Sequence, residues 1–320
     1  MTMMRRQFLL ASILASLCGG STGNALVRDP GVASKGAMHP KRLYKDGVFL
    51  STIGFGGIIL MGMEQPDADR AVAGAVERGI NYFDVAPSYG DGEAEVKLGP
   101  ALERWRKQVF LACKTMSRDA AGAAQELERS LKRLRTDHLD LYQCHAVTTL
   151  SDVDRIFARG GAIETLTKAR TAGVVRYLGF SAHSQHAALA MMDRFDFDSI
   201  LFPFNLVCYA QGDFGPAVLA RAKEKGVARL ALKMLTRGPW PEGAQRAWSK
   251  AWYQPIDDEV FARAAVRFTL SEEVTAAIPP GDHRLFELAR ELALAFEPLS
   301  AHERADILAD TKGLLPLFRS

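Results

Sequence analysis

Residues 79–90 have the sequence Gly79-Ile80-Asn81-Tyr82-Phe83-Asp84-Val85-Ala86-Pro87-Ser88-Tyr89-Gly90, a short apolar run that ends at Asp84 and is followed by Tyr89. Two later apolar runs also end at polar residues, Lys114 after residues 109–113 and His145 after residues 139–144. Short apolar runs bounded by turn residues are typical of buried strands. In a barrel of parallel strands, the carboxyl ends converge on one face, where active sites of this architecture lie. We therefore expect these polar side chains to meet in one cavity.

Strand and helix patterns alternate from residue 50 to residue 296. The expected strands cover residues 51–57, 80–84, 109–113, 139–144, 174–181, 199–205, 227–234 and 274–278. The expected helices include one capped by Asp67, one over 93–105 that bends or breaks at Gly99-Pro100, one over 119–134, one ending near Gly173 and one beginning near Asp282. Strands that alternate with helices predict a parallel sheet. Eight such repeats in about 250 residues predict an α/β fold, a single-domain (β/α)8 TIM barrel.

Three segments lie outside this alternation. The Asp46-Gly47 pair predicts the turn of a β-hairpin before the barrel. Residues 237–257 form a long loop on the expected catalytic side, with aromatic residues Trp240, Trp248, Trp252 and Tyr253. This loop is either a wall of the substrate pocket or a helical insertion whose tryptophans pack on the barrel rim. The C-terminal tail from Leu299 predicts a helix capped by Ser300 and Glu303, then an apolar end that could fold back over the barrel.

The residues at the strand ends form a coherent set for protonating a carbonyl oxygen. A free tyrosine titrates near 10, and an adjacent ammonium such as Lys114 would lower the pKa of Tyr89 towards the working range. A carboxylate at Asp84 would hold the lysine charged and in place. An imidazole at His145 could orient a substrate carbonyl or pass a proton. Such a set can protonate the oxygen while hydride reaches the carbon.

Residues 79–90 also resemble the signature of the aldo-keto reductases. Lys114 and the segment Asp140-Leu141-Tyr142-Gln143-Cys144-His145 fall where that family places its other two catalytic residues. The resemblance implies that Tyr89 is the general acid, Lys114 its pKa modulator, Asp84 the partner of the lysine and His145 the substrate-orienting group. It further implies NAD(P)H-dependent reduction of an aldehyde or ketone to an alcohol, and a hairpin that closes the bottom of the barrel.

The cofactor side matches the family only in part. No Gly-x-Gly-x-x-Gly precedes a helix, so the sequence does not predict a Rossmann site; the family lays its cofactor across the barrel mouth instead. The resemblance carries cofactor-binding positions onto Ser181, Asn205, Lys233, Gly281, Arg284 and Glu287. Of these, Ser181 falls where the family binds the nicotinamide amide. The chain departs from the family at Ala182, Leu201, Leu232 and Pro280, where an asparagine, a glutamine, a stacking aromatic residue and a phosphate-binding lysine are common.

The helix near Asp282 would offer free N–H groups and a positive dipole end to a phosphate. Arg284 is the candidate for a 2′-phosphate contact, which favours NADP (NADPH) over NAD, and Glu287 would lie near the adenine. A surface arginine in a first helical turn is the alternative explanation of Arg284.

Residues 1–25 have the layout of a bacterial export signal. Arg5-Arg6 precedes an apolar run over residues 8–17, and small residues follow up to Ala25. The arginine pair favours the twin-arginine route and an exported, periplasmic protein, with residues 26–40 as a linker and 41–320 as the barrel. The apolar run is too short to span a bilayer comfortably, so we expect no stable insertion of the mature chain. Lipidation at Cys18 and an apolar N-terminus on a cytoplasmic protein are the alternatives.

Composition excludes several other classes. The 320 residues are 48% hydrophobic and 24% charged, with a net charge of +3, which predicts a large globular core and no nucleic-acid partner. Cys113 and Cys144 precede Lys114 and His145, so strand alternation turns both thiols outward, where free thiols are favoured over a disulfide. His183 and His186 have metal-compatible spacing but no third ligand in sight, so no metal site is predicted.

Two other functions stay open at this stage. The same fold could serve as a cofactor-binding, redox-sensing module with little turnover. A Schiff-base lyase could use Lys114 or Lys233, although Asp84 would keep Lys114 charged and non-nucleophilic. The sequence predicts a small-molecule carbonyl substrate but not its identity, and it does not predict the oligomeric state.

Overall fold

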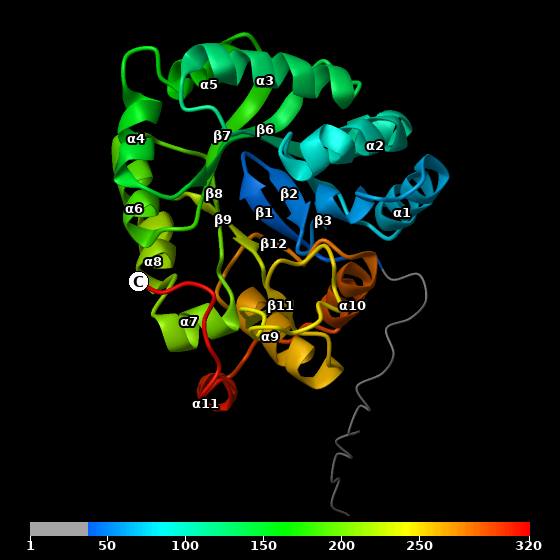
Figure 1. Ribbon diagram of the computed structural model, residues 1–320, viewed down its shortest axis with the longest axis vertical. Coiled ribbons are helices and arrows are strands. Elements are labelled where there is room, and N and C mark those ends of the chain that lie inside the picture. Colours follow the sequence, from blue (N-terminus) through cyan, green and yellow to red (C-terminus); the bar gives the residue numbers. More distant parts are fainter. Residues whose placement is uncertain (1–37) are drawn as a thin grey trace, which may run out of the picture. The chain divides into compact units, whose positions relative to one another are not determined.

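Eight parallel strands form one sheet in the order β12-β9-β8-β7-β6-β5-β4-β3. The computed structural model describes residues 38–320 (Figure 1), so the expected signal and most of the expected linker lie outside the described residues. A parallel bridge between Ile53 and Ala277 joins the two edges of the sheet. The backbone N–H of Gly54 donates to Ala277 O at 2.9 Å, and the N–H of Ala277 donates to Thr52 O at 2.9 Å. These contacts close the barrel, and the predicted (β/α)8 fold is confirmed.

The strands are shorter or longer than the apolar runs that predicted them. They are β3 (Phe55–Gly56), β4 (Tyr82–Asp84), β5 (Phe110–Thr115), β6 (Leu139–Val147), β7 (Val175–Ala182), β8 (Ser199–Phe202), β9 (Ala228–Leu232) and β12 (Ala276–Ile278). The first expected strand began at Ser51, but Ser51 ends β2 of the hairpin instead. The sixth was expected to reach Asn205, which caps the following helix. Apolar residues continue past the ladder because the connecting loops are also buried.

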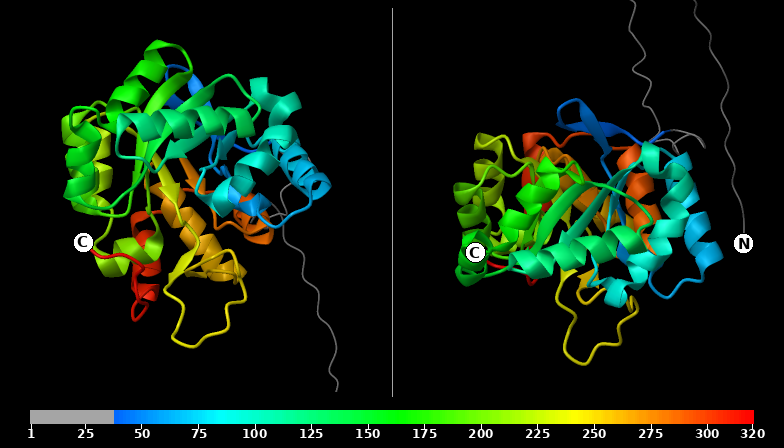
Figure 2. Two further views of the ribbon diagram at one scale, coloured as in Figure 1. Left: turned by 45° about the horizontal axis from the view of Figure 1, so that its top comes forward. Right: turned by 90° about the horizontal axis from the view of Figure 1, so that it is seen from above.

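Helices surround the sheet, and Figure 2 shows them outside the barrel wall. They are α1 (Gln65–Glu77), α2 (Glu93–Leu102), α3 (Ala120–Arg133), α4 (Leu150–Phe157), α5 (Ala162–Thr171), α6 (Gln185–Arg194), α7 (Leu206–Gly212), α8 (Pro216–Glu224), α9 (Glu259–Ser271) and α10 (His283–Leu294). The helix expected over 119–134 is α3, and Asp119 is its N-cap, accepting from the N–H of Gly122 at 2.8 Å. Two helices, α4 and α5, occupy the segment where one was expected.

Two expectations about helix ends were wrong. Asp67 does not cap α1: the helix begins at Gln65 after the N-cap Glu64, because a proline in the first turn favours that start. The second helix does not break at Gly99-Pro100 but runs on to Leu102. Gly99 serves close packing instead, because a Cβ there would lie 2.3 Å from the carbonyl oxygen of Arg133 on α3.

The hairpin closes one end of the barrel, as predicted. Strands β1 (Lys41–Lys45) and β2 (Val48–Ser51) pair antiparallel, and Asp46 and Gly47 in the turn have φ of 50° and 77°. Tyr44 and Leu50 belong to the buried cluster inside the barrel, with Tyr82, Phe110, Leu141 and Tyr177 among its members. The hairpin lies at the end of the barrel opposite the long loop of residues 239–253 (Figure 2).

That loop connects β10 (Thr236–Gly238) to β11 (Gln254–Pro255), and it contains no helix. The alternative of a helical insertion is therefore wrong. The tail forms α11 (Ala301–Asp310) with the predicted Ser300–Glu303 capping box. Its end folds back over the barrel: the Phe318 ring stacks on His183 at a centroid distance of 5.3 Å.

Cys113 and Cys144 are buried free thiols, as expected. The register places Thr115, not Cys113, opposite Cys144, which separates the two thiols along the strands. Within residues 38–320, no helix has both the length and the apolar character needed to cross a membrane.

Candidate active site

The ends of β4 and β5 bring three of the predicted residues into contact. Asp84 ends β4, Lys114 lies near the end of β5, and Tyr89 lies in the turn that follows β4. The Lys114 ammonium pairs with the Asp84 carboxylate, with the lysine side chain fully buried and that of the aspartate 3% exposed. The same nitrogen lies 3.3 Å from the Tyr89 hydroxyl oxygen. It also donates to the carbonyl oxygen of Val85 at 3.0 Å.

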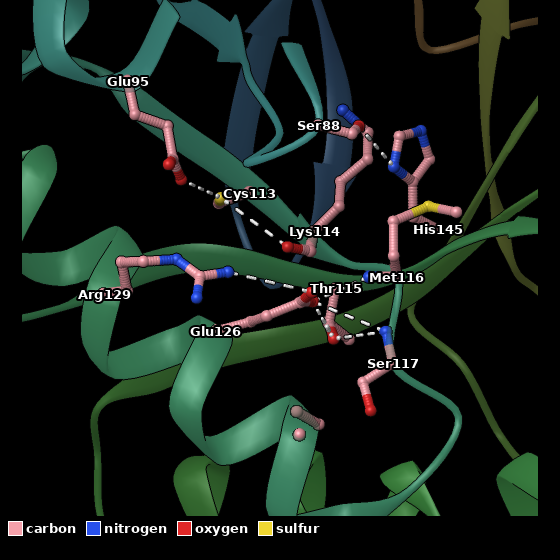
Figure 3. A network of polar contacts seen from close by, with 12 residues as sticks. Ser88, Glu95, Cys113, Lys114, Thr115, Met116, Ser117, Glu126, Arg129 and His145 are labelled. Atoms are coloured by element: carbon pink, nitrogen blue, oxygen red, sulfur yellow. Dashed lines mark hydrogen bonds and ion pairs between the residues drawn. The ribbon is translucent and has the colours of Figure 1, made fainter. Parts of the chain in front are cut away.

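His145 joins this group from β6. Its ring lies edge-on to the Tyr89 ring, with centroids 5.8 Å apart and an interplanar angle of 83°. Its Nδ1 atom lies 3.5 Å from Ser88 Oγ, and Figure 3 marks this contact with a dashed line. All four residues predicted at the strand ends therefore meet at one face of the barrel.

The protonation states follow from burial and from the charges nearby. Burial alone would lower the pKa of Lys114, but Asp84 and then Tyr89 outweigh it and hold that pKa above its ordinary value. Burial raises the pKa of Tyr89, and the Lys114 ammonium offsets only part of this rise. Lys114 thus lowers the pKa of Tyr89 as expected, but burial outweighs it, and the net pKa does not come down towards the working range. Tyr89 keeps its proton at neutral pH, in the form that can donate it.

His145 is held neutral. Burial lowers its pKa well below the ordinary value, and the nearby charges of Lys114 and Lys233 lower it further. A neutral imidazole carries one N–H donor and one acceptor nitrogen. His145 can therefore donate a hydrogen bond without carrying a charge.

Two residues that support Asp84 were not predicted. The Tyr82 hydroxyl donates to Asp84 Oδ2 at 3.3 Å, and Gln143 Nε2 donates to the same oxygen at 3.2 Å. The ladder places Gln143 opposite Lys114, on the same face of the sheet. The alternation of side chains along a strand could have indicated Gln143. It lies two positions before His145, and residues two apart in a strand lie on the same face of the sheet.

Helix α3 fixes the loop that follows β5 (Figure 3). Glu126 accepts from Thr115 Oγ1 at 2.6 Å and from the N–H of Met116 at 2.8 Å. Behind the strand, Glu95 pairs with Arg133 at 3.1 Å and accepts from Cys113 Sγ at 3.4 Å. These contacts hold the residues directly before and after Lys114 in place.

The candidate cofactor residues of β7 and α7 are buried. Ser181 Oγ accepts from the N–H of Ala146 at 2.8 Å, and its hydroxyl proton is free to be donated. Asn205 caps α7, where its Oδ1 accepts from the N–H of Cys208 at 3.0 Å. The Asn205 side chain is thus already engaged in holding the helix.

Lys233 follows β9 in the left-handed region, with φ of 61°. Its Nζ atom lies 3.2 Å from His183 Nε2, and 5.6 Å and 6.0 Å from the ring centroids of Trp252 and Phe318. Among the ion pairs of residues 38–320, none involves Lys233. Burial lowers its pKa to about 7, and the charge of Lys114 adds to the lowering. A partly buried ammonium that has no carboxylate partner among the described residues favours an anionic ligand.

The remaining candidates lie around the start of α10. Asp282 caps the helix and accepts from the N–H of Arg284 at 2.9 Å. The exposed Arg284 guanidinium pairs with Asp282 and lies over the Trp248 ring, 4.3 Å from its centroid. A Cβ at Gly281 would lie 2.2 Å from Ile58 Cγ2, so only glycine fits there. Glu287 is bound by arginines, at 2.8 Å from Arg290 and 3.6 Å from Arg78.

The long loop lies on the same face as these residues. Lys250 reaches across the mouth to donate to the carbonyl oxygen of Ile59 at 2.7 Å. Trp252 is 54% exposed and stands beside Lys233, while Tyr253 is buried. Across the described part of the chain, no three histidine, cysteine or acidic side chains are grouped as a metal site.

A closed barrel with a buried lysine–aspartate pair, a tyrosine and a histidine at its strand ends defines a class of carbonyl-reducing oxidoreductases. Residues 52–247 match the family model described as the Aldo/keto reductase family. The chain belongs to that family.

The chain is also similar in sequence to curated proteins. The chain is 31% identical to "Aldo-keto reductase YhdN" of Bacillus subtilis over 205 residues, which cover 59% of this chain and 58% of YhdN. It is 24% identical to "Uncharacterized oxidoreductase YqkF" of the same organism over 308 residues, which cover 84% of this chain and 98% of YqkF.

Among solved structures, the holo form of aldo-keto reductase AKR11C1 from Bacillus halodurans has a TM-score of 0.67 at 24% identity, covering 88% of this chain and 98% of that one. An aldo-keto reductase from Klebsiella pneumoniae in complex with NADPH has a TM-score of 0.63 at 19% identity, covering 85% and 94%. These likenesses show the shared barrel fold.

Proposed function

We propose that this protein uses NAD(P)H to reduce an aldehyde or ketone to an alcohol, with Tyr89 as the proton donor. The observation that carries the proposal is the 3.3 Å distance between the Tyr89 hydroxyl and the Lys114 ammonium, which is itself paired with Asp84. A tyrosine can lose its proton readily only where the tyrosinate is stabilised. The buried ammonium supplies that stabilisation at the donor atom.

Each side chain then has one role. Tyr89 donates its proton to the carbonyl oxygen, and Lys114 stabilises the tyrosinate that results. Asp84 keeps Lys114 charged, and Tyr82 and Gln143 hold Asp84 in place. The neutral His145 donates a hydrogen bond that orients the carbonyl. The nicotinamide cofactor, when bound, supplies the hydride.

The residues around the mouth fit an anionic dinucleotide. Ser181 offers a buried hydroxyl for the nicotinamide amide, and Lys233 has no carboxylate partner among the described residues. At the expected phosphate end of the cofactor site, Gly281 has no side chain that would keep a ligand from the backbone. The N-terminus of α10 lies directly after it and can bind a phosphate. Arg284 favours NADP over NAD, because a guanidinium binds a phosphate through two parallel hydrogen bonds. Asn205 and Glu287 would support this site through α7 and α10.

Two measurements on protein lacking residues 1–37 test the proposal. The first is a fluorescence titration with NADPH and with NADH. The second follows NADPH oxidation with a panel of aliphatic and aromatic aldehydes and ketones. Saturable NADPH binding together with turnover of at least one carbonyl supports the proposal. Failure to bind either nucleotide contradicts it.

A second candidate function rests on Lys233. Its pKa of about 7 leaves a large neutral fraction at physiological pH, which is the form that attacks a carbonyl to give a Schiff base. Lys114 is unsuited to this role because Asp84 keeps it charged. Borohydride reduction in the presence of an aldehyde would fix the ligand on Lys233 if this chemistry occurs. Mass spectrometry without an adduct at Lys233 would exclude it.

We further propose that the protein is exported by the twin-arginine route, with residues 1–25 as the signal, 26–40 as a linker and 41–320 as the barrel. Arg5 and Arg6 ahead of an apolar run carry this proposal. Export after folding would let the cofactor bind in the cytoplasm first. Replacing both arginines by lysine should move the protein from the periplasmic to the cytoplasmic fraction. An unchanged distribution would contradict the proposal.

A further inference from the structure

Strand β6 contains an irregularity at the position of His145. Its ladder with β7 pairs Cys144 with Phe180 but Val147 with Ala182, so β6 carries one extra residue between these pairs. Ala146 has φ of 52°, in the left-handed region that an L-residue adopts at a cost of roughly 1–2 kcal/mol. Bulges of this kind re-aim a side chain next to an active site. The direction of His145 therefore depends on what holds this bulge.

Arg118 holds it from one side. The residue lies between β5 and α3, is 7% exposed, and donates from Nη1 to the carbonyl oxygen of His145 at 2.8 Å and from Nη2 to that of Ala146 at 3.1 Å. Its Nε donates to Asp152 Oδ1 at 3.0 Å. Asp152 is fixed in turn at the start of α4, where its N–H donates to Thr149 Oγ1 at 3.0 Å.

Ser181 holds the bulge from the other side. The N–H of Ala146 donates to Ser181 Oγ at 2.8 Å, and the N–H of His183 donates to Val147 O at 3.2 Å. A single short segment thus joins His145 to Ser181. Of these partners, only the Arg118 guanidinium binds the carbonyl oxygens of both His145 and Ala146.

We propose that Arg118 is a positioning residue, whose guanidinium holds the β6 bulge in the form that sets His145 relative to Ser181. This inference rests on the proposed function, in which His145 orients the carbonyl and Ser181 binds the nicotinamide amide. Arg118 touches neither substrate nor cofactor in this account. It acts through the backbone of residues 145 and 146, and it thereby sets the distance between the reacting partners.

The chain offers a matched control at the opposite end of the same strands. Arg106 also bonds backbone carbonyls, those of His138 at 2.9 Å and Val109 at 3.3 Å, and it pairs with Asp140 at 2.9 Å. Its removal costs a comparable set of contacts far from His145. Comparing Arg118→Met with Arg106→Met separates positioning from a general loss of stability.

The experiment measures kcat, KM and Tm of Arg118→Met, Arg118→Lys and Arg106→Met, together with the His145 imidazole resonances, assigned by their loss in His145→Asn. We expect Arg118→Met to lower kcat about 100-fold and to shift the His145 resonances, because a misplacement of about 1 Å costs that much. A lysine at this position can bind only one of the two carbonyls, so kcat of Arg118→Lys should be about tenfold higher than that of Arg118→Met. Arg106→Met should keep the wild-type kcat and resonances at a similar loss of Tm.

Equal kcat, KM and His145 resonances in Arg118→Met and Arg106→Met would overturn the inference. If Arg118→Met does not fold, Asp152→Asn replaces it, since it keeps the carbonyl contacts and removes only the anchoring carboxylate. It should shift the same resonances and lower kcat a few-fold, whereas wild-type values for both would overturn the inference. Absence of turnover in the wild type would instead contradict the proposed function, while the resonances would still test the positioning.

Discussion

The ammonium of Lys114 lies 3.3 Å from the hydroxyl oxygen of Tyr89, and burial still holds the pKa of that hydroxyl above its ordinary value. The lysine therefore does not keep Tyr89 ionised before the reaction. Its charge acts when the proton leaves, because the tyrosinate then forms beside it. The pair is arranged to stabilise the product of proton transfer more than its starting state.

Asp84→Asn should lower kcat about 10- to 100-fold, because it removes the carboxylate that keeps Lys114 charged and in place. The affinity for NADPH should stay within a few-fold of the wild type. Asp198→Asn is the control, since Asp198 is also buried and pairs with a lysine, Lys45, on the hairpin at the other end. A kcat for Asp84→Asn within twofold of the wild type would contradict the role of Asp84.

At saturating NADPH, kcat/KM for the carbonyl should be flat from pH 6 to pH 9. Reduction needs a protonated Tyr89, whose pKa is raised, so activity should fall only at strongly alkaline pH. His145, whose pKa is lowered, should give no inflection near 6.5, since it is already neutral there. Rates over a pH series test both points. An inflection near 6.5 that disappears in His145→Asn would show that the histidine acts as a charged acid.

NADPH affinity should fall as pH rises through about 7. Lys233 carries a positive charge below its pKa and loses it above, so the anion is bound more strongly at the acidic end. The loss should be about tenfold, the order of one charge-assisted hydrogen bond. Titrations at several pH values test this, with Lys233→Met expected to be nearly independent of pH and Lys225→Met to follow the wild type. If NADPH affinity of Lys233→Met fell with pH as steeply as that of the wild type, Lys233 would not be part of the NADPH site.

Arg284→Ala should weaken NADPH binding about tenfold and leave NADH binding unchanged, because only NADPH carries the 2′-phosphate. Arg263→Ala on α9, another exposed arginine with an acidic partner, Glu259, is the control. Fluorescence titration of both nucleotides gives the ratio directly. Equal losses for NADPH and NADH would mean that Arg284 supports the helix rather than recognising the phosphate.

The barrel could be predicted because each strand is a short apolar run followed by an amphipathic helix, and the parallel order follows from that alternation. Three of the four candidate catalytic residues could be predicted for the same reason, since Asp84, Lys114 and His145 each follow directly on such a run. Tyr89 comes five residues after Asp84. Exact strand ends could not be predicted, because the loops around Thr52 and Asn205 are buried like the strands and include apolar residues such as Ile53 and Phe204. The packing role of Gly99 could not be predicted, because Arg133, which it contacts, is distant in sequence.

The supporting residues were harder to find. Gln143 and Arg118 are ordinary polar residues in the sequence, and their roles depend on a carboxylate and on carbonyl groups that only the fold brings near. The net pKa of Tyr89 was misjudged because burial, which the sequence does not show, outweighs the nearby ammonium. The shape of the 239–253 loop also depends on long-range contacts, such as that of Lys250 with Ile59.

The most direct test of the account is the turnover of Tyr89→Phe, measured by NADPH oxidation with a carbonyl substrate of the wild type and paired with an NADPH titration. The change removes one oxygen and keeps the ring that packs against His145. We predict that kcat falls by at least about 1,000-fold, because the change removes the hydroxyl that donates the proton, while NADPH affinity stays within a few-fold. Turnover within tenfold of the wild type, at unchanged NADPH affinity, would contradict the assignment of Tyr89 as the proton donor.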